Sequence, residues 1–272
     1  MKFSFPYFLT FIGLLLLSQL SVANGAGDVE ASLADADQIE LPEMAAIENV
    51  QKKKDTFFEF LKPIVESINQ RIQAERAWLK VVEQSVQAGK PLQYWQKHLM
   101  EDFLEYYKVD EPVGSPESFA ELFNRIDTIP SSLVLAQAAN ESAWGTSRFA
   151  VEGNNLFGQW CFVKGCGLVP SGRETDASHE VKVFDSVAES VEAYFRNINT
   201  HAQYASLRSI RAELRSLSLP LDSMDLAWGL EGYSSRGELY IQELIDMIQY
   251  NRLQSYDQTA FYAFNGIRTQ FD

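Results

Sequence analysis

Glu141 is the residue of this sequence best placed for acid–base chemistry, because it is a single acid in a small and apolar segment, residues 131–147. No Lys or Arg lies within six residues to pair with its carboxyl group. A carboxyl in apolar surroundings resists ionisation, so its pKa rises, and it can then act as a general acid near neutral pH. A solvent-facing glutamate at a helix end is the open alternative. On a helical period, Glu141 shares a face with Val134, Gln137, Ala138 and Trp144.

A helix must position this glutamate, and the sequence marks both of its ends. Pro130, followed by two serines, predicts the start of the helix, and Gly145 predicts its stop. A second motif follows shortly afterwards, Gly153-Asn154-Asn155-Leu156-Phe157-Gly158, and it continues as Gln159-Trp160-Cys161.

The two motifs together resemble those of the bacterial glucosaminidases of glycoside hydrolase family 73, and the continuation after Gly158 is most similar to the Bax-type subgroup. The resemblance extends over about residues 116–255. It implies a lysozyme-like catalytic domain that cuts the glycan strands of peptidoglycan, and it places the catalytic acid on Glu141. The implied activity is that of an endo-β-N-acetylglucosaminidase, a glycoside hydrolase.

Glycoside cleavage normally needs a second group, which stabilises the developing cation or activates water. We expect it from a small β-lobe over residues 157–184, where Glu174, Asp176 and Glu180 are candidates. The resemblance points to Glu174, with Glu180 next. The 2-acetamido group of the substrate could also serve, and all three acids could instead be solvated loop residues. The sequence therefore leaves open whether the anomeric configuration is retained or inverted.

Several residues are candidates for binding the sugar or positioning it. The resemblance implies that Tyr233 lies beside the acid, whereas Tyr240 is expected in the core or the groove wall. Aromatic faces stack on sugar rings and side-chain amides bind hydroxyl and acetamido groups. Core packing is the alternative for Trp144 and Phe157, and a turn with positive φ is the alternative for the two asparagines. The groove candidates are Trp144, Asn154, Asn155, Phe157 and Trp160.

The rest of the chain predicts an α+β, mainly α protein. Apolar stripes predict an N-terminal helical hairpin at residues 47–110, with a possible bend at Pro63. The hairpin could be a lid over the catalytic domain, but plain core packing is the interpretation we favour. The catalytic domain is expected at residues 116–258 and a C-terminal tail at 259–272. Capping boxes that begin with Ser186 and Ser235 predict two helix starts in that domain.

The start of the chain predicts export. Residues 1–23 have the pattern of a secretory signal peptide, whose apolar core is too short to span a bilayer. Residues 24–46 are predicted to be a flexible lead. We expect a mature protein without an integral membrane segment, in the periplasm or associated with the envelope. In such a compartment Cys161 and Cys166 are predicted to form a disulfide. No metal and no cofactor is expected, because the three histidines lie far apart in the sequence.

The formal net charge of −14 argues against nucleic acid as a partner. Peptidoglycan is itself anionic, so its recognition should depend on hydrogen bonds and aromatic contacts. Two other functions compete with the glucosaminidase. A lytic transglycosylase shares the fold and needs only one acid, and a non-catalytic peptidoglycan-binding protein of the envelope would need none.

Overall fold

A computed structural model describes residues 40–173 and 178–257 as a mainly helical protein with one small sheet. The predicted α+β, mainly α class is confirmed. The predicted signal peptide and most of the lead fall in residues 1–39, outside the described residues. The end of the lead forms the short helix η1 (Met44–Ala46), and the buried Met44 packs into the core. The packed part of the chain therefore begins before the predicted boundary at residue 46.

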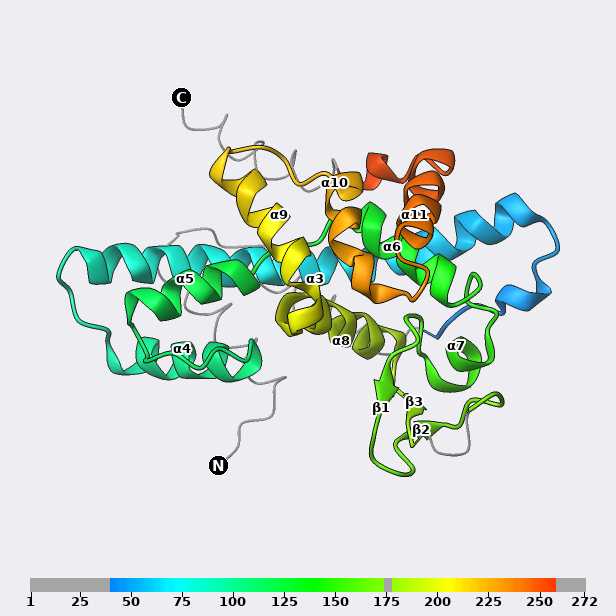
Figure 1. The fold of residues 1–272 in the computed structure, drawn as a ribbon, viewed down its shortest axis with the longest axis horizontal. Helices are drawn as coiled ribbons and strands as arrows, with labels where there is room; N and C mark the ends of the chain where they lie inside the picture. The colour runs from blue at the N-terminus through cyan, green and yellow to red at the C-terminus, as the bar shows by residue number, and fades with distance from the viewer. Residues whose placement is uncertain (1–39, 174–177, 258–272) are drawn as a thin grey trace, which may run out of the picture.

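The longest element is α3 (Val50–Gln87), which runs along the long axis of the molecule (Figure 1). The Asn49 side chain accepts a hydrogen bond from the Lys52 N–H and begins the helix. The helix continues through Pro63 as a single 38-residue element. The predicted apolar stripe is buried along it, and after a turn at Gly89 the chain enters α4 (Tyr94–Tyr106). The helical hairpin is thus formed as predicted.

The hairpin and the following helices share one continuous core. Helix α3 contacts α5 (Pro116–Arg125), α6 (Ser131–Glu141) and α8 (Val187–Thr200). The buried apolar residues of α3 and α4 belong to the same cluster as those of α6, α8 and α11 (Glu238–Tyr250). The hairpin therefore packs as part of the core, which is the interpretation favoured over a lid.

The β-lobe follows the short helix α7 (Arg148–Gly153) and lies on one side of the molecule, below α7 and α8 in the view of Figure 1. Its strands are β1 (Trp160–Cys161), β2 (Gly167–Leu168) and β3 (Glu180–Lys182). Strand β3 is central and pairs antiparallel with both others, in the order β1-β3-β2. Gly167 permits this pairing, because a Cβ there would lie 2.0 Å from the Val181 carbonyl oxygen.

The C-terminal part adds short helices that close over α6. After α8 come η2 (Ala202–Tyr204), α9 (Ala205–Ser216), α10 (Ser223–Ala227), η3 (Trp228–Tyr233), α11 and finally η4 (Leu253–Tyr256). Ser186 caps α8 as predicted, since its hydroxyl accepts from the Glu189 N–H. The capping box predicted at Ser235 is wrong. Helix α11 begins at Glu238, and its N-cap is Gly237, whose φ of +52° interrupts the helical path.

Candidate functional site

Glu141 is the last residue of α6, and the backbone beyond it explains why the helix ends there. Ala143, Trp144 and Gly145 have φ values of +51°, +61° and +74°, which a right-handed helix does not allow. The prediction that Trp144 continues the helical face of Glu141 is therefore wrong. The chain turns sharply instead, and the turn is held by the Ser142 hydroxyl, which accepts from the Gly145 N–H.

The surroundings of Glu141 raise the pKa of its carboxyl group. Burial is the largest cause, because a half-buried carboxylate loses hydration. A hydrogen bond with Tyr240 and the charge of Arg236 act in the opposite direction but do not cancel the effect of burial. A glutamate whose pKa is raised in this way is suited to deliver a proton.

Tyrosines from several helices gather around this carboxyl group. Tyr240 on α11 is buried and hydrogen-bonds Glu141 directly, so it is the tyrosine that contacts the acid. Tyr233 stacks on Tyr240 with ring centroids 5.6 Å apart, and its hydroxyl donates to the Phe157 carbonyl at 3.1 Å. Tyr233 also lies near the acid, as expected, because the Glu141 charge contributes to raising the pKa of its hydroxyl, although burial is the largest cause. Tyr240, which was expected in the core or the groove wall, is the one that hydrogen-bonds Glu141. The two tyrosines differ in their place relative to α11, because Tyr240 lies inside this helix and Tyr233 lies before its start.

Three further residues complete the surroundings of the acid. Tyr194 on α8 and Tyr204 in η2 are both close enough for the Glu141 charge to raise the pKa of their hydroxyls, although burial is the larger cause. Arg236, held by two hydrogen bonds to Glu243, is the nearby cation. Sequence reasoning missed these residues because they are 53 to 95 positions away from Glu141, and no local pattern links them to it.

The two asparagines of the second motif shape the backbone. The Asn155 amide is buried, donates to the Gln159 and Lys182 carbonyls, and accepts from the Phe157 and Gln159 N–H groups. Asn154 has a φ of +51° and donates to the Phe184 carbonyl. These hydrogen bonds favour the turn interpretation over sugar binding. The asparagines join α7 to the β-lobe and so set where the lobe lies.

The aromatic candidates divide between the core and the surface. Trp144 packs edge-on against Phe57 and Phe58 of α3, with centroids 6.0 and 5.3 Å away. Phe157 is buried and stacks on Tyr194 at 4.1 Å. Core packing is therefore favoured for both. Trp160 is 58% exposed, and one face of its ring stacks on His179 at 4.1 Å. Of the aromatic residues predicted to bind sugar, Trp160 has the ring that is open to a ligand.

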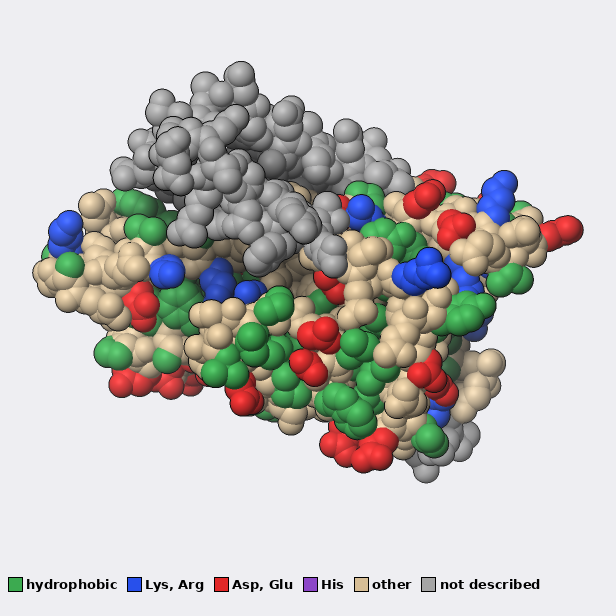
Figure 2. All heavy atoms as spheres, turned by 90° about the horizontal axis from the view of Figure 1, so that it is seen from above, with side chains coloured by type: hydrophobic (Ala, Val, Ile, Leu, Met, Phe, Trp, Pro, Cys, Tyr) green, Lys and Arg blue, Asp and Glu red, His purple; other side chains and the backbone are tan. Residues whose placement is uncertain are grey.

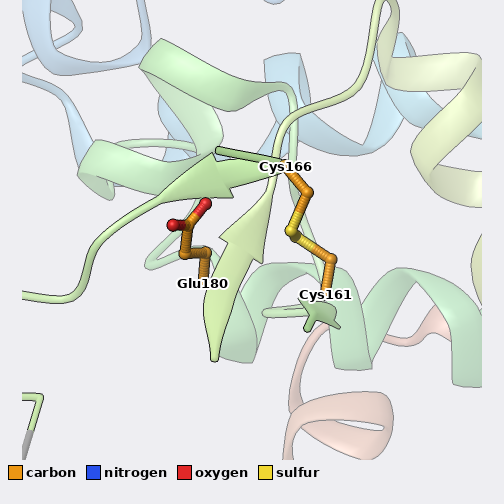
Figure 3. Close-up of side chains that lie close together, drawn as sticks. All are labelled: Cys161, Cys166 and Glu180. Atoms are coloured by element: carbon orange, nitrogen blue, oxygen red, sulfur yellow. A yellow bond between two sulfur atoms is a disulfide. The ribbon is translucent and has the colours of Figure 1, made fainter. Parts of the chain in front are cut away.

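The disulfide predicted between Cys161 and Cys166 is present, with the Cα atoms 6.2 Å apart. Figure 3 shows it beside Glu180 of β3. The Glu180 carboxylate accepts the N–H groups of Gly165 and Gly167, and these hydrogen bonds lower its pKa. Although the sulfur and carboxylate atoms lie within 4.8 Å of one another, the disulfide leaves no thiolate to bind a metal. Because these hydrogen bonds connect Glu180 to the loop between the two cysteines, they favour a structural role for Glu180 over the role of second catalytic group.

The preferred second carboxylate, Glu174, lies with Asp176 in residues 174–177, outside the described residues. One surface hollow lies between α9 and α10 and another lies beside Lys108 and Arg125, and Glu141 lines neither of these two. The sugar-binding groove beside Glu141 therefore stays a prediction. Helices long and apolar enough for a bilayer crossing are absent from residues 40–173 and 178–257.

A glutamate with a raised pKa at the end of a buried helix, in a mainly helical fold that carries a small β-lobe, fits the class of glycoside hydrolases. The family model described as mannosyl-glycoprotein endo-beta-N-acetylglucosaminidase matches residues 116–253. The chain therefore belongs to the glucosaminidase family.

Two similar proteins extend this comparison. The protein bax of Escherichia coli K12 is 35% identical over 227 residues, which cover 82% of this chain and 78% of that protein. The catalytic domain of the autolysin Auto from Listeria monocytogenes has a solved structure that aligns over 79% of this chain and 93% of its own. It is 18% identical, with a TM-score of 0.42.

Proposed function

We propose that this glucosaminidase hydrolyses the glycan backbone of peptidoglycan on the reducing side of N-acetylglucosamine, with Glu141 as the general acid. The observation that carries the proposal is the half-buried Glu141 carboxyl, whose pKa is raised by burial and which is hydrogen-bonded to the Tyr240 hydroxyl. In the reaction the Glu141 O–H bond breaks as its proton bonds to the glycosidic oxygen. The C–O bond to that oxygen then breaks, and positive charge develops on the sugar.

The partner that meets this positive charge comes either from Glu174 or from the substrate. Glu174 lies in the sequence between β2 and β3, within the lobe from which the second carboxylate is expected. The 2-acetamido group offers the other route, in which the substrate stabilises its own reacting carbon. A lytic transglycosylase, which needs only one acid, is the second candidate function. It is favoured by the causes of the Glu141 pKa shift, which include no second carboxylate among the described residues.

Peptidoglycan is proposed over a mannosyl glycoprotein because the signal-peptide pattern and the disulfide fit an envelope protein. We propose that the chain is exported and acts in the periplasm or at the envelope. Figure 2 shows acidic and basic side chains interspersed over one face, without a continuous basic stripe among the described residues that it draws. This distribution and the net charge of −14 make nucleic acid an unfavourable ligand.

The proposed acid is tested by replacing Glu141 with Gln, which keeps the shape but holds no transferable proton. Digestion of purified cell walls should fall by at least about 100-fold, with an unchanged circular dichroism spectrum. Mass spectrometry of the wild-type products should find new reducing N-acetylglucosamine ends. Anhydro-muramyl ends would assign the transglycosylase instead, and near-normal digestion by Glu141→Gln would contradict the proposal.

The proposed second carboxylate is tested by a matched pair of substitutions. Glu174→Gln should lower turnover by about 100-fold with little change in melting temperature, if Glu174 is the second group. Glu180→Gln should instead lower the melting temperature, because it weakens the hydrogen bonds that hold the Cys161–Cys166 loop. Full activity of the Glu174 variant would leave the substrate acetamido group as the partner.

A further inference from the structure

Gln137 lies one helical turn before Glu141 on α6, and its side chain is fully buried. A buried amide needs hydrogen-bond partners, and both of its partners come from other helices. The Tyr194 hydroxyl of α8 donates to its Oε1 atom, and its Nε2 atom donates to the Tyr240 hydroxyl of α11 at 3.0 Å. One amide therefore connects three helices directly behind the acid.

This chain of hydrogen bonds has a direction. A tyrosine hydroxyl carries a single hydrogen, which it can give to only one acceptor at a time. Because the Tyr240 oxygen already accepts from Gln137, its hydrogen remains for the Glu141 carboxyl group that it hydrogen-bonds. The order of donation thus runs from Tyr194 to Gln137, then to Tyr240 and finally to Glu141.

An inverted Gln137 amide would reverse the last step. Its oxygen would then take the Tyr240 hydrogen, and Tyr240 could interact with Glu141 only by accepting a proton from it. Tyr194 opposes this inversion, because its buried hydroxyl donates to Gln137 Oε1 and would lose that acceptor. Its ring is also fixed, since it stacks on Phe157 at 4.1 Å with an interplanar angle of 18°.

We infer that Gln137 and Tyr194 are positioning residues of the catalytic acid: they fix the direction of the hydrogen bond that Tyr240 donates to Glu141. The inference rests on the proposed function. When Glu141 gives its proton to the glycosidic oxygen, a carboxylate remains. The Tyr240 O–H is already oriented to donate a hydrogen bond to that carboxylate. Without that orientation the carboxylate would form beside a hydroxyl that points away.

If Gln137 or Tyr194 is replaced, we expect the pH dependence of catalysis to change. The Tyr240 hydrogen bond lowers the pKa of Glu141, so losing it should raise this pKa further. A general acid is active when protonated, and the alkaline limb of kcat/KM should therefore move to higher pH. The other groups that face Glu141 are Arg236, Tyr233 and Tyr204, and the proposed variants leave them unchanged.

The test compares Tyr194→Phe and Gln137→Met with the wild type in cell-wall digestion from pH 4 to 9. Both variants should shift the alkaline limb of the kcat/KM profile to higher pH by about one unit and should lower kcat. In a Tyr240→Phe background neither substitution should move the limb further, because the step through which they act is gone. The control is Tyr107→Phe, which removes another buried tyrosine hydroxyl, one that donates to Glu75 far along α3, and should leave the limb in place.

A second measurement does not depend on turnover. A ¹³C NMR titration of side-chain carboxyls, with Glu141 assigned by its absence in Glu141→Gln, should show a higher Glu141 pKa in Tyr194→Phe than in the wild type. An unchanged pKa and an unchanged limb, with Glu141→Gln inactive, would overturn the inference and leave the proposed function standing. An active Glu141→Gln would overturn the proposed function instead.

Discussion

At the scale of single residues, the chemistry of Glu141 results from opposing effects on one carboxyl group. Burial raises its pKa, while the Tyr240 hydrogen bond and the Arg236 charge lower it. Burial has the larger effect, so the pKa is raised, but the opposing groups are the ones that stabilise the carboxylate after the proton has left. A more buried glutamate without these partners would hold its proton too tightly to transfer it.

Trp160 allows a prediction at the same scale. Its ring is exposed and rests on His179, so Trp160→Ala should raise KM for glycan strands by roughly five- to tenfold, with little change in kcat. Trp228 is the matched control, because it is 49% exposed but lines the hollow beside α9. The measurement is binding of inactive Glu141→Gln variants to purified cell walls. Equal losses for the two tryptophan variants would contradict a sugar-binding role for Trp160.

At the scale of elements, the helix that carries the acid is capped from a distant part of the chain. Pro130 provides no side-chain cap for α6. The Asp257 carboxylate instead accepts the Ser132 N–H at 2.9 Å and the Ser132 hydroxyl at 2.6 Å. A carboxylate at a helix N-terminus is favourable, but burial and the nearby Asp222 raise the pKa of Asp257 to about 6.

Asp257→Asn should therefore change how stability depends on pH. The folded state of the wild type binds the Asp257 proton more tightly than the unfolded state, so this group lowers stability as pH rises from about 4 to 6. The amide keeps an oxygen acceptor for Ser132 but does not ionise. The melting temperature of the variant relative to the wild type should rise over that range and then level off. Asp246→Asn, on the exposed side of α11, is the control and should show no such trend.

At the scale of the whole molecule, the N-terminal hairpin and the catalytic domain are joined by a buried ionic network. Arg71 of α3 contacts Glu75 on its own helix and Glu192 of α8, the latter through two hydrogen bonds of 2.6 and 2.7 Å. Tyr106, the last residue of α4, and Tyr107, its C-cap, donate to Glu192 and Glu75 respectively. With one shared apolar core and one shared network, the two regions should unfold together.

Arg71→Met tests this junction, because it leaves two largely buried carboxylates without their cation. The free energy of unfolding should fall by about 3–5 kcal/mol. Lys97→Met removes an exposed ion pair with Glu101 and should cost less than about 1 kcal/mol. Urea denaturation followed by circular dichroism and by tryptophan fluorescence measures both. Separate transitions for the two signals in the wild type would show that the hairpin and the catalytic domain unfold independently.

The sequence by itself determined the features that depend on neighbours along the chain. The apolar stripe of α3, the start of α6 after Pro130 and the cap at Ser186 follow from local periodicity and hydrogen bonding. The pairing of the two cysteines was predicted from the signal-peptide pattern, which favours an oxidising compartment, and the disulfide is present. Glu141 was identifiable because an acid without a local cation in an apolar segment is visible in the sequence.

Only the tertiary structure decided which distant groups meet that acid. Tyr240 rather than Tyr233 hydrogen-bonds Glu141, although both lie near it, and the position of Tyr240 is set by the register of α11, which begins after Gly237. Arg236 could not be found from local charge patterns, since it approaches from the turn before α11, 95 positions away. The cap that Asp257 gives to α6 likewise spans 125 positions. These contacts depend on how packed helices are aligned, and that alignment is set by the whole core at once.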